Sequence, residues 1–180
     1  STLYHLAAKG WDDSILLERK SLTSGSTWHA AGLLPLFIMS YSVGQIHKYS
    51  VRFYQELQDE TGMDVGFRKV SNIRLASTQD RMDEYLQYKG VADTIGVEVK
   101  VLSPQEIKDC WPLVSTENLI GAIQHPEDGY IQPADLTQAF AKGARDKGAK
   151  IEINTNVISI IRSPNDTWIV ETDKGHIECD

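Results

Sequence analysis

The sequence predicts an α/β fold: a doubly wound, Rossmann-like nucleotide-binding domain with an inserted α+β segment and a β-meander. Three observations support this prediction. A helix and a short strand that ends on an acid open the chain, the order found in the second half of a nucleotide-binding βαβ unit. From about residue 67, strands and helices follow one another without that strict order. A further helix and strand then precede three short strands separated by turn residues.

The opening pair of elements is predicted from apolar spacing. Residues 3–9 have helical spacing and end at Gly10, a residue suited to a helix C-terminus. Residues 14–18 form a short buried strand, and its last residue, Glu18, is placed to hold the ribose hydroxyls of a dinucleotide. The glycine-rich turn that would precede this pair does not occur in the sequence. We therefore interpret the domain as truncated, with that turn expected before Ser1.

The next helix is the clearest in the sequence. Apolar residues recur at helical spacing over residues 42–61, and Gly62 supplies a stop. Ser42 and Gln45 match the spacing of a capping box. The apolar stripe that we expect to face the core consists of Val43, Ile46, Tyr49 or Ser50, Phe53 and Leu57. His47 falls off this stripe, so we expect it to be solvated.

Residues 67–126 form the inserted segment of the prediction. Apolar alternation and helical spacing predict its elements: a strand over 72–76, a helix over 79–95, a strand over 97–102, a helix from Pro104 to about Pro112, and a strand over 119–124. The helix over 79–95 is expected to turn four side chains inward, Met82, Tyr85, Leu86 and Ala92. Ser103 and Glu106 have the spacing of a capping box at the start of the next helix.

Residues 127–180 return the chain to the doubly wound sheet. Pro133 suits the first position of a helix, which Gly148 ends, and a strand over 150–154 follows. Strands over 157–161, 167–172 and 175–179 are separated by short turn-rich connections. This pattern predicts an antiparallel meander.

The composition excludes several classes of protein. Lys and Arg (18) are outnumbered by Asp and Glu (25), the net charge is -7, and no nucleic-acid partner is expected. The two cysteines form no C-x-x-C pair, which fits a reducing compartment. No long apolar run or signal-peptide pattern occurs. We expect no membrane partner and a cytoplasmic location, or the mitochondrial matrix in a eukaryote. Residues 125–128 (H-P-E-D) lack a second ligand cluster, so no metal site is expected.

One stretch has the composition of a nucleotide site. Residues 23–33 (T-S-G-S-T-W-H-A-A-G-L) concentrate hydroxyl residues, glycines and one histidine behind the strand that ends on Glu18. Hydroxyl and amide donors suit phosphate oxygens, and glycine permits close approach of a bulky group. A capped helix start explains the same hydroxyls, and the two interpretations coexist because a helix N-terminus also binds anions. Without this context His29 would be an ordinary packed histidine.

Three stretches of the sequence are distinctive: Glu18-Arg19, residues 22–33 (L-T-S-G-S-T-W-H-A-A-G-L) and residues 128–133 (D-G-Y-I-Q-P). They resemble the dimethylglycine and sarcosine dehydrogenase family, FAD-dependent oxidoreductases of the D-amino-acid oxidase group. The resemblance implies that His29 carries FAD through a covalent bond to the 8α-methyl carbon of the flavin. The cofactor contacts that we expect come from Glu18, Arg19, Ser24, Gly25, Ser26, Thr27, Trp28, His29, Ala30, Ala31, Gly32, Leu33 and Val157. For Val157, an ordinary place in a core strand is the alternative.

The resemblance also implies an activity: oxidation of an N-methylated glycine by hydride transfer to the flavin. The iminium product would be hydrolysed, or captured by tetrahydrofolate where a C-terminal folate domain exists. Electrons would pass to an electron-transfer flavoprotein or to oxygen. No general base can be named from the sequence. The expected division is an FAD-binding segment over 1–66, a substrate-domain segment over 67–126 and a second FAD-binding segment over 127–180.

Two alternatives stay open at this point. One is an amine or D-amino-acid oxidase that binds FAD without a covalent bond. The other is a non-catalytic regulatory relative that keeps the fold as an interaction module. Family members are much longer than 180 residues, so we also expect these residues alone to bind FAD weakly and to be unstable.

Overall fold

The structure is a computed structural model that describes all residues from Ser1 to Asp180. The chain forms two compact units. Unit 1 consists of Ser1–Ala31, Leu57–Val65 and Pro133–Asp180, and unit 2 consists of Gly32–Glu56 and Gly66–Gln132. The functional division at residues 66 and 126 stays a prediction.

The order of elements matches the expected mixture of helices and strands. In chain order they are α1 (Thr2–Ala8), β1 (Ile15–Leu17), the 3-10 helix η1 (Ser26–His29), β2 (Leu33–Leu34), α2 (Tyr41–Thr61), β3 (Arg68–Lys69), β4 (Asn72–Ala76), α3 (Gln79–Ile95), β5 (Lys100–Leu102), α4 (Pro104–Cys110), β6 (Gly121–His125), β7 (Gly129–Tyr130), α5 (Pro133–Asp146), β8 (Lys150–Glu152), β9 (Val157–Arg162), β10 (Trp168–Thr172) and β11 (Gly175–Cys179).

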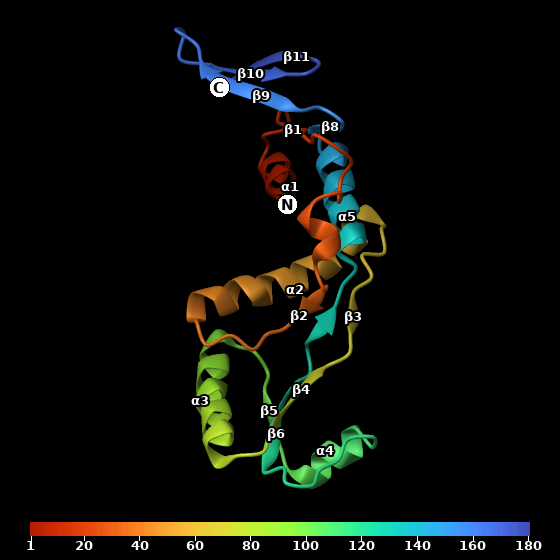
Figure 1. Cartoon of the computed structure of the whole chain (residues 1–180), viewed down its shortest axis with the longest axis vertical. Helices are drawn as coiled ribbons and strands as arrows, with labels where there is room; N and C mark the ends of the chain where they lie inside the picture. Colours follow the sequence, from red (N-terminus) through yellow and green to blue (C-terminus); the bar gives the residue numbers. More distant parts are fainter. The chain divides into compact units, whose positions relative to one another are not determined.

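Unit 1 contains the parallel pairing that the doubly wound fold predicts. Strand β1 pairs with β8 in parallel, with Leu17 opposite Glu152. The pairing continues one residue further, because the Glu18 N–H donates to the carbonyl of Glu152 at 2.8 Å. Helices α1 and α5 pack against each other (Figure 1), with Tyr4 edge-on to Phe140 at a centroid distance of 5.7 Å. The predicted helix-strand pairs at both ends of this unit are confirmed, but β1 is half-buried where a buried strand was expected.

The predicted meander is also part of unit 1. Strands β9, β10 and β11 form a three-stranded antiparallel sheet in that order, visible in blue in Figure 1. The residues that connect β10 to β11 make the expected tight turn, with Thr172 opposite Gly175. The meander that the sequence predicts over the last strands is therefore confirmed.

Unit 2 is built on an antiparallel sheet with strand order β4-β6-β5. Helices α3 and α4 both contact β6 (Figure 1). The Thr78 hydroxyl caps α3 by accepting from the Arg81 N–H, and the predicted capping box of Ser103 and Glu106 begins α4. A second, smaller sheet has the order β2-β7-β3.

Two expectations about helix α2 are wrong. The helix begins at Tyr41, because the Gly44 N–H donates to the Ser40 carbonyl at 2.8 Å. Ser42 therefore lies inside the first turn, and Gln45 instead donates to the carbonyl of Ile95 at 3.4 Å. The expected inward stripe is buried at its C-terminal half only, since Ile46 is 63% exposed while Leu57 is fully buried.

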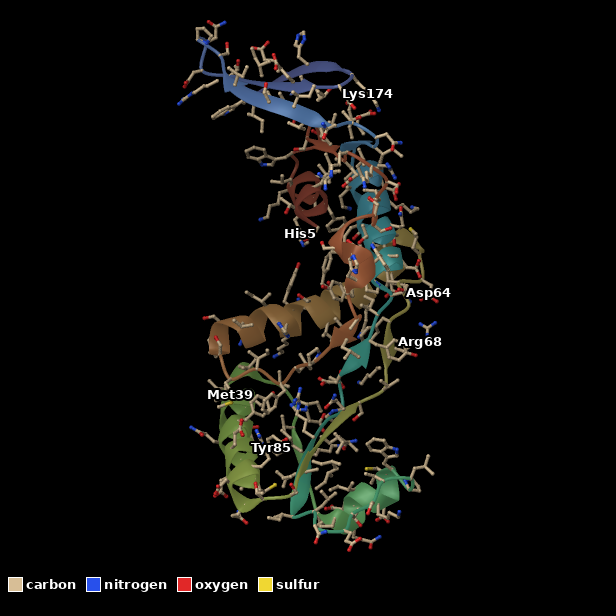
Figure 2. The ribbon with its side chains drawn as sticks, in the orientation of Figure 1. His5, Met39, Asp64, Arg68, Tyr85 and Lys174 are labelled. Carbon is tan, nitrogen blue, oxygen red and sulfur yellow. The ribbon has the colours of Figure 1, made fainter.

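Two further side chains differ from expectation because contacts distant in sequence decide their burial. His47 is half-buried rather than solvated, and its Nδ1 lies 2.9 Å from the Pro35 carbonyl oxygen. On α3, Leu86 is 48% exposed, and Tyr88 is fully buried in its place. Tyr85, on the same helix and labelled in Figure 2, donates its hydroxyl to the Leu75 carbonyl. The inward face of α3 therefore runs through Met82, Tyr85, Tyr88 and Ala92.

Candidate cofactor site

Glu18 lies where the sequence predicts the ribose-binding acid, directly after the parallel strand β1. Its side chain is half-buried, and Oε1 accepts a hydrogen bond from the Lys20 N–H at 2.9 Å. The carboxyl end of a parallel strand is where ligands bind in open α/β sheets. Arg19, the next residue, is exposed.

Val157 comes close to this strand end through the backbone. The Thr155 N–H donates to the Glu18 carbonyl at 2.9 Å, and Val157 begins β9 two residues later. Val157 is 38% exposed, which favours a surface position over one in a packed core strand. Glu18 and Val157, separated by most of the sequence, are thus brought together in unit 1.

The hydroxyl-rich stretch forms a short 3-10 helix and not an α-helix. Thr23 has a left-handed backbone, with φ 71°, and η1 follows from Ser26 to His29 with Gly25 before it. No side chain caps this turn. Ser24 and Ser26 are exposed, and their hydroxyls make no hydrogen bond within the chain. The capped α-helix start that the sequence allowed is therefore absent, and the hydroxyls face solvent.

His29 ends η1 and is accessible. Its ring lies against Trp28, with centroids 4.0 Å apart and planes inclined at 35°. Trp28 is 66% exposed, His29 is exposed, and the His29 imidazole makes no hydrogen bond within the chain. Helix α5 runs beside η1 (Figure 1). An exposed imidazole with uncommitted nitrogens is chemically able to act as a nucleophile.

The end of the predicted site belongs to unit 2. Gly32 has φ 74°, a conformation that costs glycine little, and its carbonyl accepts from the Ile131 N–H at 2.8 Å. Leu33 is 70% exposed and pairs with Tyr130 through β2 and β7. Ala30 and Ala31, the last motif residues in unit 1, are also exposed.

The donors present fit an FAD molecule. Solvent-facing hydroxyls of Ser24 and Ser26 suit a diphosphate, and the Glu18 carboxylate at a parallel strand end suits a ribose. Trp28 and Leu33, from the same stretch of sequence, expose large apolar side chains, and an aromatic ring system can pack against such side chains.

Sequence reasoning missed a buried polar cluster in unit 2. His125 is fully buried, Asp128 is 2% exposed, and Tyr88 is fully buried beside them. His125 Nε2 lies 3.1 Å from the Tyr88 hydroxyl, which donates to the Leu36 carbonyl at 2.7 Å. The guanidinium of Arg74 lies over the Phe37 ring at 4.3 Å. The sequence shows only the run H-P-E-D-G directly after an apolar strand. Because such polar residues are seldom buried, this run did not predict a buried cluster.

Burial shifts the acid–base equilibria of this cluster. Loss of solvation, helped by the charge of Arg74, lowers the pKa of His125 to about 4. Loss of solvation raises the pKa of Asp128 to about 6, against the opposing effects of the Leu36 N–H and Arg74. It also raises the pKa of Tyr88 to about 12. At neutral pH the cluster therefore holds a neutral imidazole, a carboxylate and a neutral phenol.

These shifts predict opposite pH dependences for two variants. His125 favours the folded state above pH 6.5, and this contribution is lost as the pH falls towards 4. Asp128 favours the folded state below about pH 4, and its contribution is lost as the pH rises through 6. Each contribution is on the order of 3 kcal/mol. Relative to the wild type, Asp128→Asn should lose stability between pH 6 and 4, while His125→Gln should gain it.

Urea unfolding of the three proteins, each expressed from its complete reading frame, at several pH values measures these differences. Both substitutions preserve the hydrogen bonds of the cluster, since the Asn oxygen can accept from Leu36 and the Gln amide can donate to Tyr88. Parallel stability curves for the three proteins would contradict the assignment.

Unit 2 also holds a cavity of about 590 Å³. It is bordered by residues of α2, by the residues after α3 and by Glu127, and no predicted cofactor residue lines it. Its charged groups are engaged within the chain: Lys48 donates to the Ile95 carbonyl at 3.1 Å, and Glu127 pairs with Lys69.

None of the helices has the length and apolar character needed to cross a membrane.

A parallel strand that ends on an acid, with a hydroxyl-rich turn behind it, is the arrangement expected of a dinucleotide-binding fold. The model of the DAO family, described as FAD dependent oxidoreductase, matches residues 1–180. The chain therefore belongs to this family, and the family resemblance found in the sequence is confirmed.

Individual relatives match nearly the whole length of the chain. It is 38% identical to mitochondrial dimethylglycine dehydrogenase of Rattus norvegicus over 98% of the chain and 21% of that protein. It is 35% identical to the mitochondrial pyruvate dehydrogenase phosphatase regulatory subunit of Mus musculus, over 99% of the chain and 20% of the relative. The chain spans about a fifth of the length of these relatives.

A solved structure supports the same fold. L-proline dehydrogenase from P.horikoshii superimposes with a TM-score of 0.87 at 26% identity, over 98% of this chain and 47% of that one. The predicted mixed α/β fold with a parallel strand pair is thereby confirmed.

Proposed function

We propose that the chain binds FAD through residues 18–33 and Val157, as part of an enzyme that oxidises an N-methylated glycine. The observation that carries the proposal is the place of the W-H-A-A-G motif: His29 is exposed beside solvent-facing hydroxyls in a chain of the FAD dependent oxidoreductase family. Glu18 would hold the ribose, and Ser24 to Thr27 would hold the diphosphate.

His29 would bind the flavin covalently at its 8α-methyl carbon. The imidazole has no hydrogen-bond partner in the chain that competes for its nitrogens, and Trp28 restricts its ring on one side. Such a bond would prevent loss of the cofactor and make the flavin a stronger electron acceptor. Small side chains at Ala30, Ala31 and Gly32 would leave room for the ring system.

When bound, FAD supplies the acceptor for a hydride from the N-methyl carbon of the substrate. The dimethylglycine dehydrogenase relative supports an N-methylated glycine as substrate. Release of the one-carbon unit by tetrahydrofolate is proposed only for a protein that carries a folate domain, and the electron acceptor would be an electron-transfer flavoprotein or oxygen. We assign no general base, which fits a fold whose chemistry resides in the cofactor.

A regulatory role is the second candidate, because one relative is a phosphatase regulatory subunit. An amine oxidase with non-covalent FAD is the third. His29 and its neighbouring hydroxyls argue against a purely structural module, which has no need of an accessible imidazole.

Anaerobic titration of the protein expressed from its complete reading frame tests the substrate class. Dimethylglycine and sarcosine are expected to bleach the absorbance of the oxidised flavin at roughly 450 nm. Glycine, which lacks an N-methyl carbon, should leave this absorbance unchanged. Bleaching by D-amino acids alone would favour the non-covalent oxidase. A protein without flavin absorbance would favour the regulatory role.

A further inference from the structure

The motif D-G-Y-I at residues 128–131 lies nearly a hundred residues after the W-H-A-A-G stretch, and the proposed function gives it no role. In unit 2 it meets the segment 32–36 (G-L-L-P-L) residue by residue. The Ile131 N–H donates to the Gly32 carbonyl at 2.8 Å. Tyr130 and Gly129 pair with Leu33 and Leu34.

Asp128 completes this pairing with its side chain. Its Oδ1 accepts from the Leu36 N–H at 2.9 Å, while the Tyr88 hydroxyl donates to the Leu36 carbonyl at 2.7 Å. Leu36 itself is 4% exposed. Both polar groups of this residue are therefore held by buried side chains, one from α3 and one from the connection between β6 and β7.

Apolar packing holds Leu36 in the core of unit 2, with Leu34 packed against that core, but this packing does not extend to Leu33. Strand β2 has two residues, and Leu33 is 70% exposed, so apolar burial contributes little at the position where the predicted cofactor contacts lie. A two-residue pairing is weak by itself. Hydrogen bonds between buried side chains and the backbone of Leu36 can fix the conformation of such a short segment.

Burial of the polar cluster around His125 and Asp128 costs folding free energy, so we infer that the cluster has a role beyond packing. His125 Nδ1, Asp128 Oδ2 and Arg74 Nε are buried and have no hydrogen-bond partner in the chain. Unpartnered buried polar atoms destabilise a fold. Apolar residues of similar size would pack the same volume without that penalty.

We propose that Tyr88 and Asp128, backed by His125, form a clamp on Leu36 that positions Gly32 and Leu33 for the cofactor. They are positioning residues, and the proposal rests on the proposed function because it assumes that Gly32 and Leu33 contact FAD. The D-G-Y-I motif would then fix the position of Gly32 and Leu33, the last two residues of the W-H-A-A-G-L motif.

Tyr88→Phe tests the clamp with a matched control. It removes the hydroxyl that donates to Leu36, and Tyr85→Phe removes a hydroxyl that donates to the Leu75 carbonyl at 3.3 Å from the same helix. Asp128→Leu removes the acceptor for the Leu36 N–H, and Asp128→Asn restores one. Proteins from the complete reading frame are compared in a His29→Ala background, so that FAD binding is reversible.

Two readouts separate the clamp from the cofactor. Hydrogen exchange of a peptide covering residues 32–36, without FAD, should be faster in Tyr88→Phe and Asp128→Leu than in the His29→Ala parent, Tyr85→Phe or Asp128→Asn. Titration with FAD should show an affinity about fivefold to tenfold weaker for Tyr88→Phe, the effect of one hydrogen bond. Tyr85→Phe and Asp128→Asn should stay within about twofold of the parent protein.

The outcomes are distinct. Unchanged exchange in residues 32–36 of Tyr88→Phe and Asp128→Leu would overturn the clamp, whatever the flavin result. Faster exchange with unchanged FAD affinity would overturn the positioning role. A parent protein that binds no FAD would overturn the proposed function, and with it the positioning role, while the exchange data would still decide whether the clamp exists.

Discussion

Replacing His29 by alanine is expected to remove all flavin that stays with the protein after acid precipitation. The proposed covalent bond has the His29 imidazole as its protein partner, and alanine has no nucleophilic nitrogen. Acid unfolds the protein and releases a non-covalent cofactor, so the fluorescence of the pellet reports the bond alone. The expected change is from about one flavin per protein chain to none.

His47→Ala is the matched control, since this second histidine lies in the same stretch of chain but contacts the Pro35 carbonyl. It should keep its acid-stable flavin. The supernatant of His29→Ala should contain free FAD, because the hydroxyls of residues 24–27 and the Glu18 carboxylate remain. Equal flavin in the pellets of wild type and His29→Ala would remove His29 as the attachment site.

The largest effect on stability is expected from Gly129→Ala. A Cβ at this position would overlap the carbonyl oxygen of Arg68 and lie 3.2 Å from the Cα of Lys69. These are backbone atoms of β3, the neighbour of β7, so they cannot turn aside as a side chain could. We expect a loss of about 3 kcal/mol, at the upper end for overpacking.

Gly90→Ala is the control for this change because it adds the same methyl group in the same unit. Gly90 lies within α3 and has open space around its Cα, so alanine should stabilise the helix by about 0.5 to 1 kcal/mol. Urea unfolding measures both variants. Equal stability of Gly129→Ala and the wild type would mean that β3 and β7 are not packed as closely as described.

Local signals in the sequence were sufficient where neighbouring residues fix the structure. The capping box of Ser103 and Glu106 correctly placed the start of α4, and Gly148 correctly ended the helix that begins at Pro133. The meander followed from its turn residues. Each of these features depends on contacts within a few residues, which is the range that periodicity and capping describe.

Contacts across the fold account for the errors. Leu86 and Tyr88 both fit the spacing of α3, and the Phe37 ring, 4.3 Å from Tyr88 between centroids, decides which one is inside. The burial of Asp128 depends on a hydrogen bond to Leu36, which is 92 residues away in the sequence. The clamp on segment 32–36 was invisible for the same reason. The proposed cofactor residues lie in a local motif that the sequence reveals, whereas the contacts that fix them come from residues distant in the sequence.

Peptide mapping by mass spectrometry tests most directly whether this chain carries FAD on His29. Trypsin cleaves after Lys20 and Lys48, and the intervening peptide, residues 21–48, contains His29 and His47 but no other cleavage site. We expect this peptide to carry the mass of the flavin and its fragmentation to place the flavin on His29. A flavin on His47, or an unmodified peptide from a protein that contains flavin, would rule out attachment at His29.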